Sequence, residues 1–334
     1  MAKLRMRQAI MTALGDAMAE DETVILLGED IAAAGGAFKV TEGLLEKFGP
    51  ARVRDTPISE MGFLGAAVGA AVSGLKPVVE MMYVEFIGVA LDQLVTEAAK
   101  MRYLSRGSLG VPLVVRASAG AGLGFGCQHS QMLEQWFRAT AGLKLAVPSG
   151  PQSAYGLLRS AIRDPDPVVI LEPRALYGVR EEVKTGDAGV VALGQARRVT
   201  DGDDVTIVTL GQMVGVASDA AARARWTAEV IDLQTLVPWD RDAVVESVAR
   251  TGRITVVEES PYSGGWGTEV TDHVCGELFG KLSAPPLRIT APDVPIPYSG
   301  SLEARYLPSA EYVTEQVDEL LRTGKRPRPW WRCD

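Results

Sequence analysis

This chain has few histidines and cysteines, with two histidines and three cysteines among its 334 residues. The cysteines, Cys127, Cys275 and Cys333, are odd in number and far apart, and none has metal-ligand spacing. They predict no disulfide framework and indicate a reducing compartment, which we take to be the cytoplasm. Aromatic residues make up 6% of the chain and all hydrophobic residues 47%, so we expect a mostly aliphatic core.

The chain also lacks the features of nucleic-acid and membrane proteins. Its formal net charge is −8, and the last ten residues hold its only basic cluster, which argues against nucleic acid as a partner. The N-terminus has no apolar stretch of the signal-peptide type. The small apolar run 62–74 is too short to cross a bilayer. We predict no nucleic-acid and no membrane partner.

Two nucleotide-binding patterns are absent. The glycine-rich loop 120–126 has alternating glycines but lacks the Lys-Ser/Thr ending of a P-loop. It also fails to open a βαβ unit with an acidic residue at the right distance. Hydride transfer with a dinucleotide bound to this chain is therefore disfavoured.

Strand-like and helical stretches alternate, which predicts an α/β fold of two domains, each a mostly parallel sheet flanked by helices. The expected strands of the first series are 23–27, 78–82, 111–115, 143–147 and 168–171, with helices at 7–19, 62–73, 89–103 and 153–163. The second series has strands at 204–210, 228–232 and 254–258 and helices at 215–225, 241–250 and 267–277. We place the domains at 1–180 and 201–322, a linker at 181–200 and a tail without a fold of its own at 323–334.

The segment 55–74 is the most informative part of the sequence. Ser59 is a predicted N-cap that leaves Glu60 in the first turn of a Gly/Ala-rich helix, where the helix dipole favours an anion. A carboxyl group at the tip of a buried helix suits proton exchange with a ligand. Gly65, Gly69 and Ser73 share one face of this helix. That face indicates close helix packing, within the chain or between subunits, or an ordinary Ala-rich core helix.

Two further residues are candidates for chemistry. His129 follows the glycine-rich loop between Gln128 and Ser130, and we favour a functional role over a capping or core histidine. Glu29 follows the first expected strand, where ligands of open α/β sheets bind, although a turn of solvated acids explains it equally well. His273, within an expected helix, is interpreted as structural.

Seven segments in one order carry a family resemblance. They are 27–31, 35–44, 55–63, 84–93, 128–131, 141–144 and 160–164. Through them the chain, over about residues 1–320, resembles the β subunits of thiamine-diphosphate-dependent 2-oxo acid and acetoin dehydrogenases. The segments 80–93 and 100–103 are most similar to acetoin dehydrogenase, with pyruvate dehydrogenase next.

The resemblance implies a pyrimidine-binding, transketolase-like domain followed by a transketolase C-terminal domain, in an α2β2 heterotetramer. The cofactor would be thiamine diphosphate (ThDP), shared with an α subunit that also holds Mg²⁺. The Gly-Asp-Gly…Asn magnesium signature is absent here, which fits a β subunit.

The resemblance also implies site residues. Glu60 would face N1′ of the aminopyrimidine and promote removal of the C2 proton of the cofactor, which then acts as electron sink. Phe86 would stack on the pyrimidine, Glu29 would lie near it, and His129 would lie near the substrate carbonyl. A structural K⁺ would be held by Leu113, Ala161, Ile162, Asp164 and Asp166.

The resulting hypothesis is a β subunit that helps to cleave acetoin or a 2-oxo acid and passes the product group to a lipoyl acyltransferase. The alternative is a two-subunit ThDP-dependent carboligase or transketolase with no lipoyl acceptor. A non-catalytic assembly subunit would require Glu60 to be dispensable, which the joint presence of Glu60, Phe86 and His129 disfavours.

Overall fold

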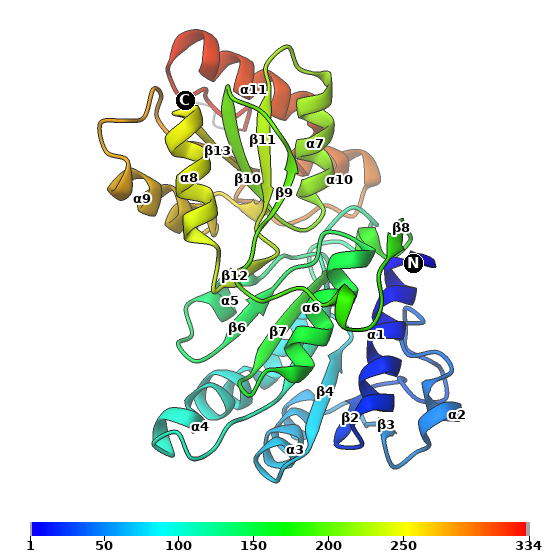
Figure 1. The fold of residues 1–334 in the computed structure, drawn as a ribbon. Coiled ribbons are helices and arrows are strands. Elements are labelled where there is room, and N and C mark those ends of the chain that lie inside the picture. Colours follow the sequence, from blue (N-terminus) through cyan, green and yellow to red (C-terminus); the bar gives the residue numbers. More distant parts are fainter. Residues whose placement is uncertain (1, 332–334) are drawn as a thin grey trace.

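The computed structural model describes residues 2–331 and consists of two α/β units stacked on one another (Figure 1). The larger sheet has seven strands in the order β12-β6-β7-β5-β4-β2-β3. In that order the strands are Thr235–Val237, Lys144–Ala146, Val168–Pro173, Val114–Ala119, Lys76–Met81, Val24–Gly28 and Val53–Asp55. All neighbours are parallel except β12, which pairs antiparallel with β6.

Helices cover both faces of the larger sheet, as expected for parallel strands. One face is packed by α1 (Met6–Glu20) and α6 (Pro151–Arg163). The other is packed by α3 (Glu60–Val72) and by the segments that follow β4. These segments and the remaining short helices are η1 Val84–Ala90, η2 Gln93–Ala98, α4 Ala99–Leu104, α2 Leu44–Phe48, α5 Glu134–Arg138, η3 Arg174–Leu176 and η4 Asp187–Gly189. The pair β1 (Ala2–Arg5) and β8 (Arg180–Val183) forms a separate antiparallel ribbon.

The smaller sheet has five strands in the order β14-β13-β10-β11-β9. In that order they are Leu287–Ala291, Ile254–Pro261, Val205–Thr209, Ala228–Asp232 and Arg197–Thr200, of which only β9 is antiparallel to its neighbour. Its helices are α7 Met213–Arg223, α8 Arg241–Thr251, α9 Gly267–Glu277, α10 Gly300–Tyr306 and α11 Ala310–Thr323. The predicted fold class, two α/β domains with mostly parallel sheets, is confirmed.

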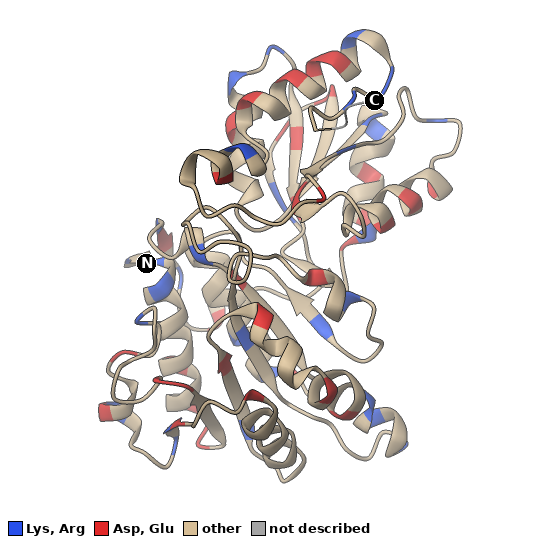
Figure 2. Cartoon of the chain, turned by 180° about the vertical axis from the view of Figure 1, so that it is seen from behind, with Lys and Arg blue, Asp and Glu red and all other residues tan. Residues whose placement is uncertain are grey.

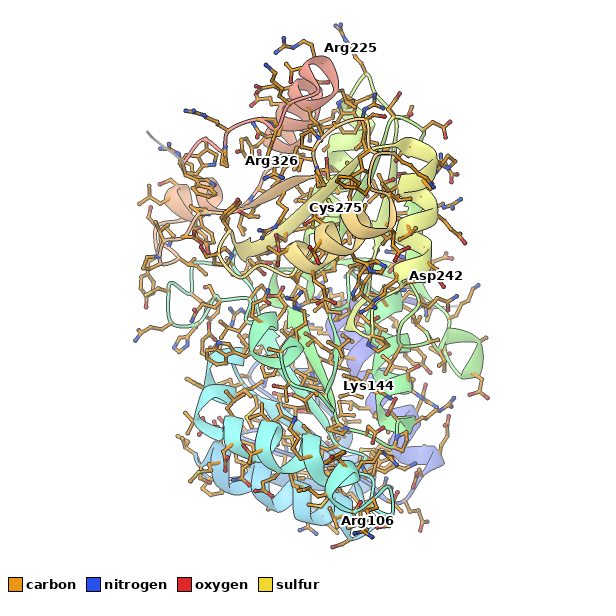
Figure 3. All side chains as sticks on the ribbon, turned by 90° about the vertical axis from the view of Figure 1, so that its left-hand side faces the viewer. Arg106, Lys144, Arg225, Asp242, Cys275 and Arg326 are labelled. Carbon is orange, nitrogen blue, oxygen red and sulfur yellow. The ribbon has the colours of Figure 1, made fainter. Side chains whose placement is uncertain are left out.

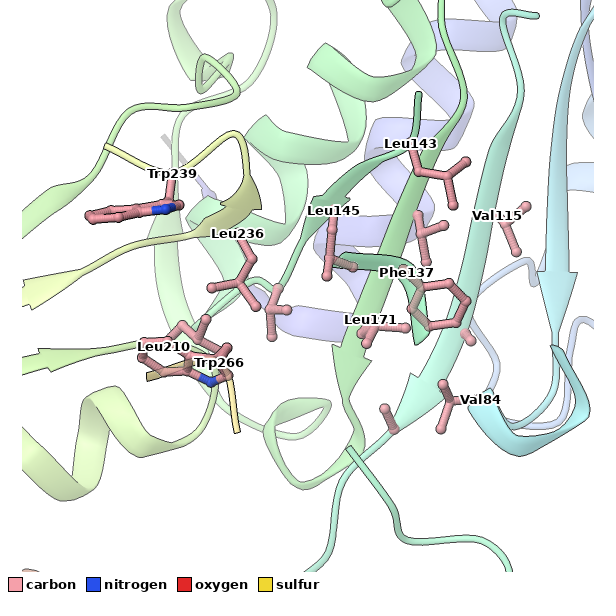
Figure 4. Packing of buried hydrophobic residues seen from close by; sticks show 14 of the residues in the cluster. Val84, Val115, Phe137, Leu143, Leu145, Leu171, Leu210, Leu236, Trp239 and Trp266 are labelled. Carbon is pink, nitrogen blue, oxygen red and sulfur yellow. The ribbon is translucent and has the colours of Figure 1, made fainter. Parts of the chain in front are cut away.

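The two units share part of their core (Figure 4). Leu145 and Phe137 of the first unit belong to the same buried cluster as Leu210, Trp239 and Trp266 of the second. Strand β12 lies beyond β11 in sequence and nevertheless completes the edge of the larger sheet. The connection between the units is therefore a packed interface and not a flexible tether.

Local structure departs from the predicted elements at some points. The stretch 89–103, predicted as one helix, is divided into 3₁₀, π-helical and α-helical turns. The strand predicted at 111–115 begins three residues later, at Val114. The segment 181–200, predicted as a linker, holds most of β8 and all of β9. Trp330 donates its backbone N–H to the Tyr312 hydroxyl (3.2 Å) in the tail, while Cys333 lies outside the described residues.

Acidic and basic residues are interspersed over both units, as Figure 2 shows. Within residues 2–331 no helix is long and apolar enough to cross a membrane. Cys127 and Cys275 are free thiols, and Cys275 lies on α9 in the smaller unit (Figure 3).

A buried ion-pair network crosses the middle of the larger sheet. Arg116 on β5 donates to Glu80 on β4 (2.9 Å) and, with two nitrogens, to Glu172 on β7 (2.8 and 2.9 Å). Arg116 and Glu172 are each 2% exposed. The Tyr177 hydroxyl also donates to Glu172 (2.7 Å). One guanidinium thus binds two carboxylates that are almost entirely shielded from water.

Arg116→Met is expected to lower the free energy of unfolding by about 3–5 kcal/mol, because it leaves two buried carboxylates without their cation. The matched control is Arg163→Met, which removes a half-exposed arginine from Glu20 and Asp187 and should cost less than about 1 kcal/mol. Denaturant unfolding followed by circular dichroism measures both. Equal losses in the two variants would contradict the role given to Arg116.

Glu134 on α5 is a second buried acid, at the contact between the units. Its Oε2 accepts from Ser260 Oγ (2.9 Å), and its Oε1 has no hydrogen-bond partner. Burial raises the pKa of Glu134 from 4.5 to about 7. Between these pH values the folded state holds a proton that the unfolded chain has released, so stability falls as the pH rises.

Glu134→Gln should remove this part of the pH dependence, because an amide cannot ionise. We expect the variant to gain on the order of 2 kcal/mol over the wild type at pH 8, and much less at pH 5. Melting curves at the two pH values measure the difference. The control is Glu246→Gln at an exposed position of α8; a pH-independent effect of Glu134→Gln would contradict the assignment.

Candidate functional site

The candidate site lies at the carboxyl edge of the larger sheet, where ligands of parallel sheets gather. Strand β2 leads into Glu29 there, and the segment after β3 leads to Glu60. The two segments are joined by hydrogen bonds from Thr56 N to the Gly28 carbonyl (2.9 Å) and from Ala32 N to Asp55 Oδ1 (2.7 Å). The sheet thus brings two of the predicted acids to one place.

Glu60 is the first residue of α3 and is 8% exposed. Ser59 occupies the predicted N-cap position, but its hydroxyl makes no capping bond, and only its carbonyl accepts from Phe63 N (3.0 Å). Burial raises the pKa of Glu29, and the nearby charges of Glu60 and Asp30 raise it further. Glu29 Oε1 is buried without a partner. The two carboxyls are therefore close enough for the charge of one to act on the other.

Phe86 and His129 meet in an aromatic cluster beside α3. The His129 ring stacks on Tyr83 at a centroid distance of 4.5 Å and meets the edge of Phe86 at 5.5 Å. Its Nδ1 is buried without a partner. Glu85 accepts from Gln131 N (2.8 Å) and so ties η1 to the histidine loop. Because η1 packs on α3, all four predicted site residues belong to one region.

Sequence reasoning missed three residues of this region. Glu85 lies within the segment 84–93 that carries Phe86, and Tyr83 directly precedes that segment. Their closeness to Phe86 in the sequence was the signal that could have identified them. Arg174, 45 residues from His129, gave none. It is 2% exposed and donates to the Gly120 carbonyl (3.1 Å) and to the His129 carbonyl. Its guanidinium also lies 4.2 Å from the Phe125 ring centroid.

The buried polar atoms of the site test whether an aminopyrimidine fits there. Glu29 Oε1, Thr56 Oγ1, Glu85 Oε2 and His129 Nδ1 all lack partners within the chain. Buried polar atoms are normally paired, so these four require a ligand, water or a partner. Acceptors and aromatic faces in one place suit a flat heterocycle that carries N–H groups. The residues present therefore fit the pyrimidine half of the implied cofactor.

A divalent metal has no matching set of ligands here. Across the described part of the chain there is no group of three His, Cys, Asp or Glu side chains arranged to hold a metal ion.

The predicted potassium ligands surround the end of α6. Asp164 N donates to the Ala161 carbonyl (3.2 Å), and Lys144 Nζ binds both oxygens of Asp164 (2.8 and 2.6 Å). Asp166 is paired with Arg102. Lys144 lies in the middle part of the molecule in Figure 3. Both carboxylates are thus neutralised within the chain, whereas carbonyls at a helix C-terminus retain lone pairs that suit a cation.

A cavity of about 490 Å³ lies between the units next to the histidine loop. The loop residues Cys127 and Ser130 line it on one side, and Glu259 and Tyr306 on the other. The Ser130 hydroxyl is buried without a partner. The loop that carries His129 is therefore in contact with the smaller unit as well as with the candidate site.

Comparison with known proteins agrees with this arrangement. The transketolase pyrimidine-binding domain matches residues 2–180, and the transketolase C-terminal domain matches residues 194–313. The chain is 42% identical, over 97% of its length, to the pyruvate dehydrogenase E1 component subunit beta-2 of Oryza sativa, of which it covers 86%. It is also 42% identical to the acetoin:2,6-dichlorophenolindophenol oxidoreductase subunit beta of Cupriavidus necator, with 97% of this chain and 99% of that protein covered.

Among solved structures, a split-gene transketolase described as an inactive β4 tetramer superimposes with a TM-score of 0.78 at 25% identity, covering 96% of this chain and 99% of that one. This likeness extends the agreement from sequence to three dimensions. On both domain matches and on relatives of this identity over nearly the whole length, the chain belongs to the family of E1-type β subunits of pyruvate dehydrogenase and acetoin oxidoreductase.

Proposed function

We propose that this chain is the β subunit of a ThDP-dependent dehydrogenase that cleaves the C–C bond of acetoin or of a 2-oxo acid such as pyruvate. The observation that carries the proposal is the pair Glu29 and Glu60, two carboxyls at the carboxyl edge of a parallel sheet that are close enough for burial and the charge of Glu60 together to raise the pKa of Glu29. The relatives of this chain include a pyruvate dehydrogenase subunit and an acetoin oxidoreductase subunit, so they support either substrate. The product group would pass to a lipoyl acyltransferase.

Each residue of the site has a separate proposed role in the reaction. Bound ThDP supplies the electron sink for cleavage next to a carbonyl. Glu60, at a helix tip and largely shielded from water, would exchange a proton with the pyrimidine nitrogen. Phe86 provides a flat face for the ring, and Glu29 lies beside Glu60 to accept from its amino group. His129, whose buried Nδ1 has no partner in the chain, would lie near the substrate carbonyl.

An α subunit is the proposed partner, in an α2β2 heterotetramer in which it holds Mg²⁺ and the diphosphate. Exposed apolar residues around the site support it: Ile58 is 85% exposed, Met61 57% and Val89 63%. On the adjoining face of α3, Gly69 and the exposed Ser73 have small side chains, and a Cβ at Gly69 would meet no neighbouring atom within 4 Å. A surface of this kind fits an obligate partner better than solvent.

The domains are proposed to be 1–180 and 201–322, and the compartment the cytoplasm. A structural K⁺ is proposed at the carbonyls of Leu113, Ala161 and Ile162 with Asp164 and Asp166.

Glu60→Gln should lower kcat of the complex by about 10²–10⁴-fold, because the amide cannot deliver a proton to the pyrimidine. Binding of ThDP, followed by quenching of intrinsic fluorescence, should change much less. Glu22→Gln at an exposed position before β2 is the control and should keep full activity. Normal turnover in Glu60→Gln would instead favour the assembly-subunit hypothesis.

The chain co-purified with its α partner should reduce 2,6-dichlorophenolindophenol in a ThDP- and Mg²⁺-dependent manner with acetoin or pyruvate. Branched 2-oxo acids are tested beside these two. Acetylation of a lipoyl domain by the same complex would identify the physiological acceptor. ThDP binding without turnover on any of these would favour the carboligase alternative, and absence of ThDP binding would overturn the cofactor assignment.

The melting temperature of the complex should be higher in KCl than in tetramethylammonium chloride of equal ionic strength, because an ion bound only by the folded state stabilises it. The large organic cation cannot enter a ring of carbonyls. Identical melting curves in the two salts would contradict the potassium site.

A further inference from the structure

Residues of the smaller unit hold the glycine-rich loop 120–126, which precedes His129, by hydrogen bonds. Glu303 of α10 accepts from Gly122 N through Oε1 (2.8 Å) and from Gly124 N through Oε2 (2.9 Å). Glu259 of β13 accepts from Ala121 N (2.6 Å). Glu303 is 3% exposed and Glu259 7%. Three amides of one loop are therefore held by two buried carboxylates from the other unit.

The backbone conformation of the loop allows its N–H groups to bind these carboxylates. Gly120, Gly122, Gly124 and Gly126 all have positive φ, between 71° and 106°. This alternation turns neighbouring N–H groups toward one side, where they form an anion-binding concavity. The loop makes few bonds to regular structure, so its amides depend on partners of this kind.

Two other residues of the smaller unit, Gln212 and Tyr298, also contact the loop. Gln212 donates to the Ala121 carbonyl (3.2 Å) and to Glu259 Oε2 (2.7 Å). The Tyr298 ring lies over Gly126 so closely that a Cβ there would stand 2.2 Å from it. The loop can move only if these contacts with the smaller unit are broken.

The position of His129 depends on the same loop. Gly120 N donates to the Gln131 carbonyl (3.1 Å), which closes the loop just beyond the histidine. Arg174 binds the Gly120 and His129 carbonyls together. Displacement at Gly122 or Gly124 is therefore transmitted to the histidine backbone, and from there to its stacking on Tyr83.

We propose that Glu303 is a positioning residue for His129: it fixes the glycine-rich loop and thereby sets where the imidazole meets the substrate. The inference rests on the proposed function, in which His129 faces the substrate carbonyl. It gives the smaller unit a role in the reaction, although none of its residues belongs to the predicted site.

The test uses Glu303→Gln in the complex with the α partner. An amide keeps one acceptor oxygen but turns an N–H₂ group against a backbone N–H, so one of the two loop bonds is lost. Hydrogen exchange of residues 120–126 should speed up by about tenfold or more, because hydrogen bonds to charged groups are strong. The kcat should fall by about tenfold while the affinity for ThDP is unchanged.

Two variants are matched to Glu303→Gln. Glu311→Gln makes the same change at an exposed carboxylate of α11, paired with Arg223, and should alter neither readout. Glu303→Asp keeps the charge and should recover part of both the exchange protection and kcat. It also serves as the test variant if Glu303→Gln fails to fold.

A double-mutant cycle with His129→Ala separates positioning from general stability. If Glu303 acts through His129, the double variant should be no slower than His129→Ala alone. Multiplicative losses, unchanged exchange in the loop, or faster exchange with unchanged kcat would each overturn the proposal. A wild-type complex that binds no ThDP would refute the proposed function instead, and the exchange experiment would still show whether the loop is held.

Discussion

The site depends first on the guanidinium of Arg116, which holds Glu80 and Glu172 on the two strands beside its own. Three neighbouring strands are thereby tied together in the middle of the larger sheet. Glu80 in turn limits the exit of β2, since a Cβ at Gly28 would stand 2.9 Å from the Glu80 carbonyl oxygen. Only glycine fits there, and the chain then delivers Glu29 to the edge of the sheet. Removal of this cation would disturb the floor of the site as well as the stability of the sheet.

The second constraint is the contact between the two units. Because β12 joins the larger sheet and one hydrophobic cluster runs through both units, the smaller unit is fixed in orientation. Its buried acids Glu259 and Glu303 then reach amides of the histidine loop. Burial raises the pKa of Glu259 to about 7, as it does that of Glu134. Glu259 and Glu303 fix the geometry of the loop between Gly120 and Gln131.

The sequence allowed prediction of whatever is encoded locally or periodically. The apolar runs predicted the central strands, and the Ser59-Glu60 pair predicted the start of α3, because a cap and a first-turn acid are local signals. Arg174, Glu259 and Glu303 could not be found in this way, since each acts on a loop 45 to 181 residues distant. Short strands such as β9 and β12 were missed because three or four residues carry no period. The division of 89–103 into unlike helical turns reflects tertiary packing on α3, which overrides helix propensity.

The remaining polar groups explain why this chain needs a partner. Glu29, Thr56, Glu85 and His129 each leave a buried atom without a partner, and each such atom costs free energy in the isolated chain. The exposed side chains of Ile58, Met61 and Val89 lie in the segments that carry this site, where they add apolar surface that water solvates poorly. A cofactor that pairs the polar atoms and a subunit that covers the apolar rim would remove both costs together. Binding of the one therefore favours binding of the other, because each makes the environment of the second drier and better defined.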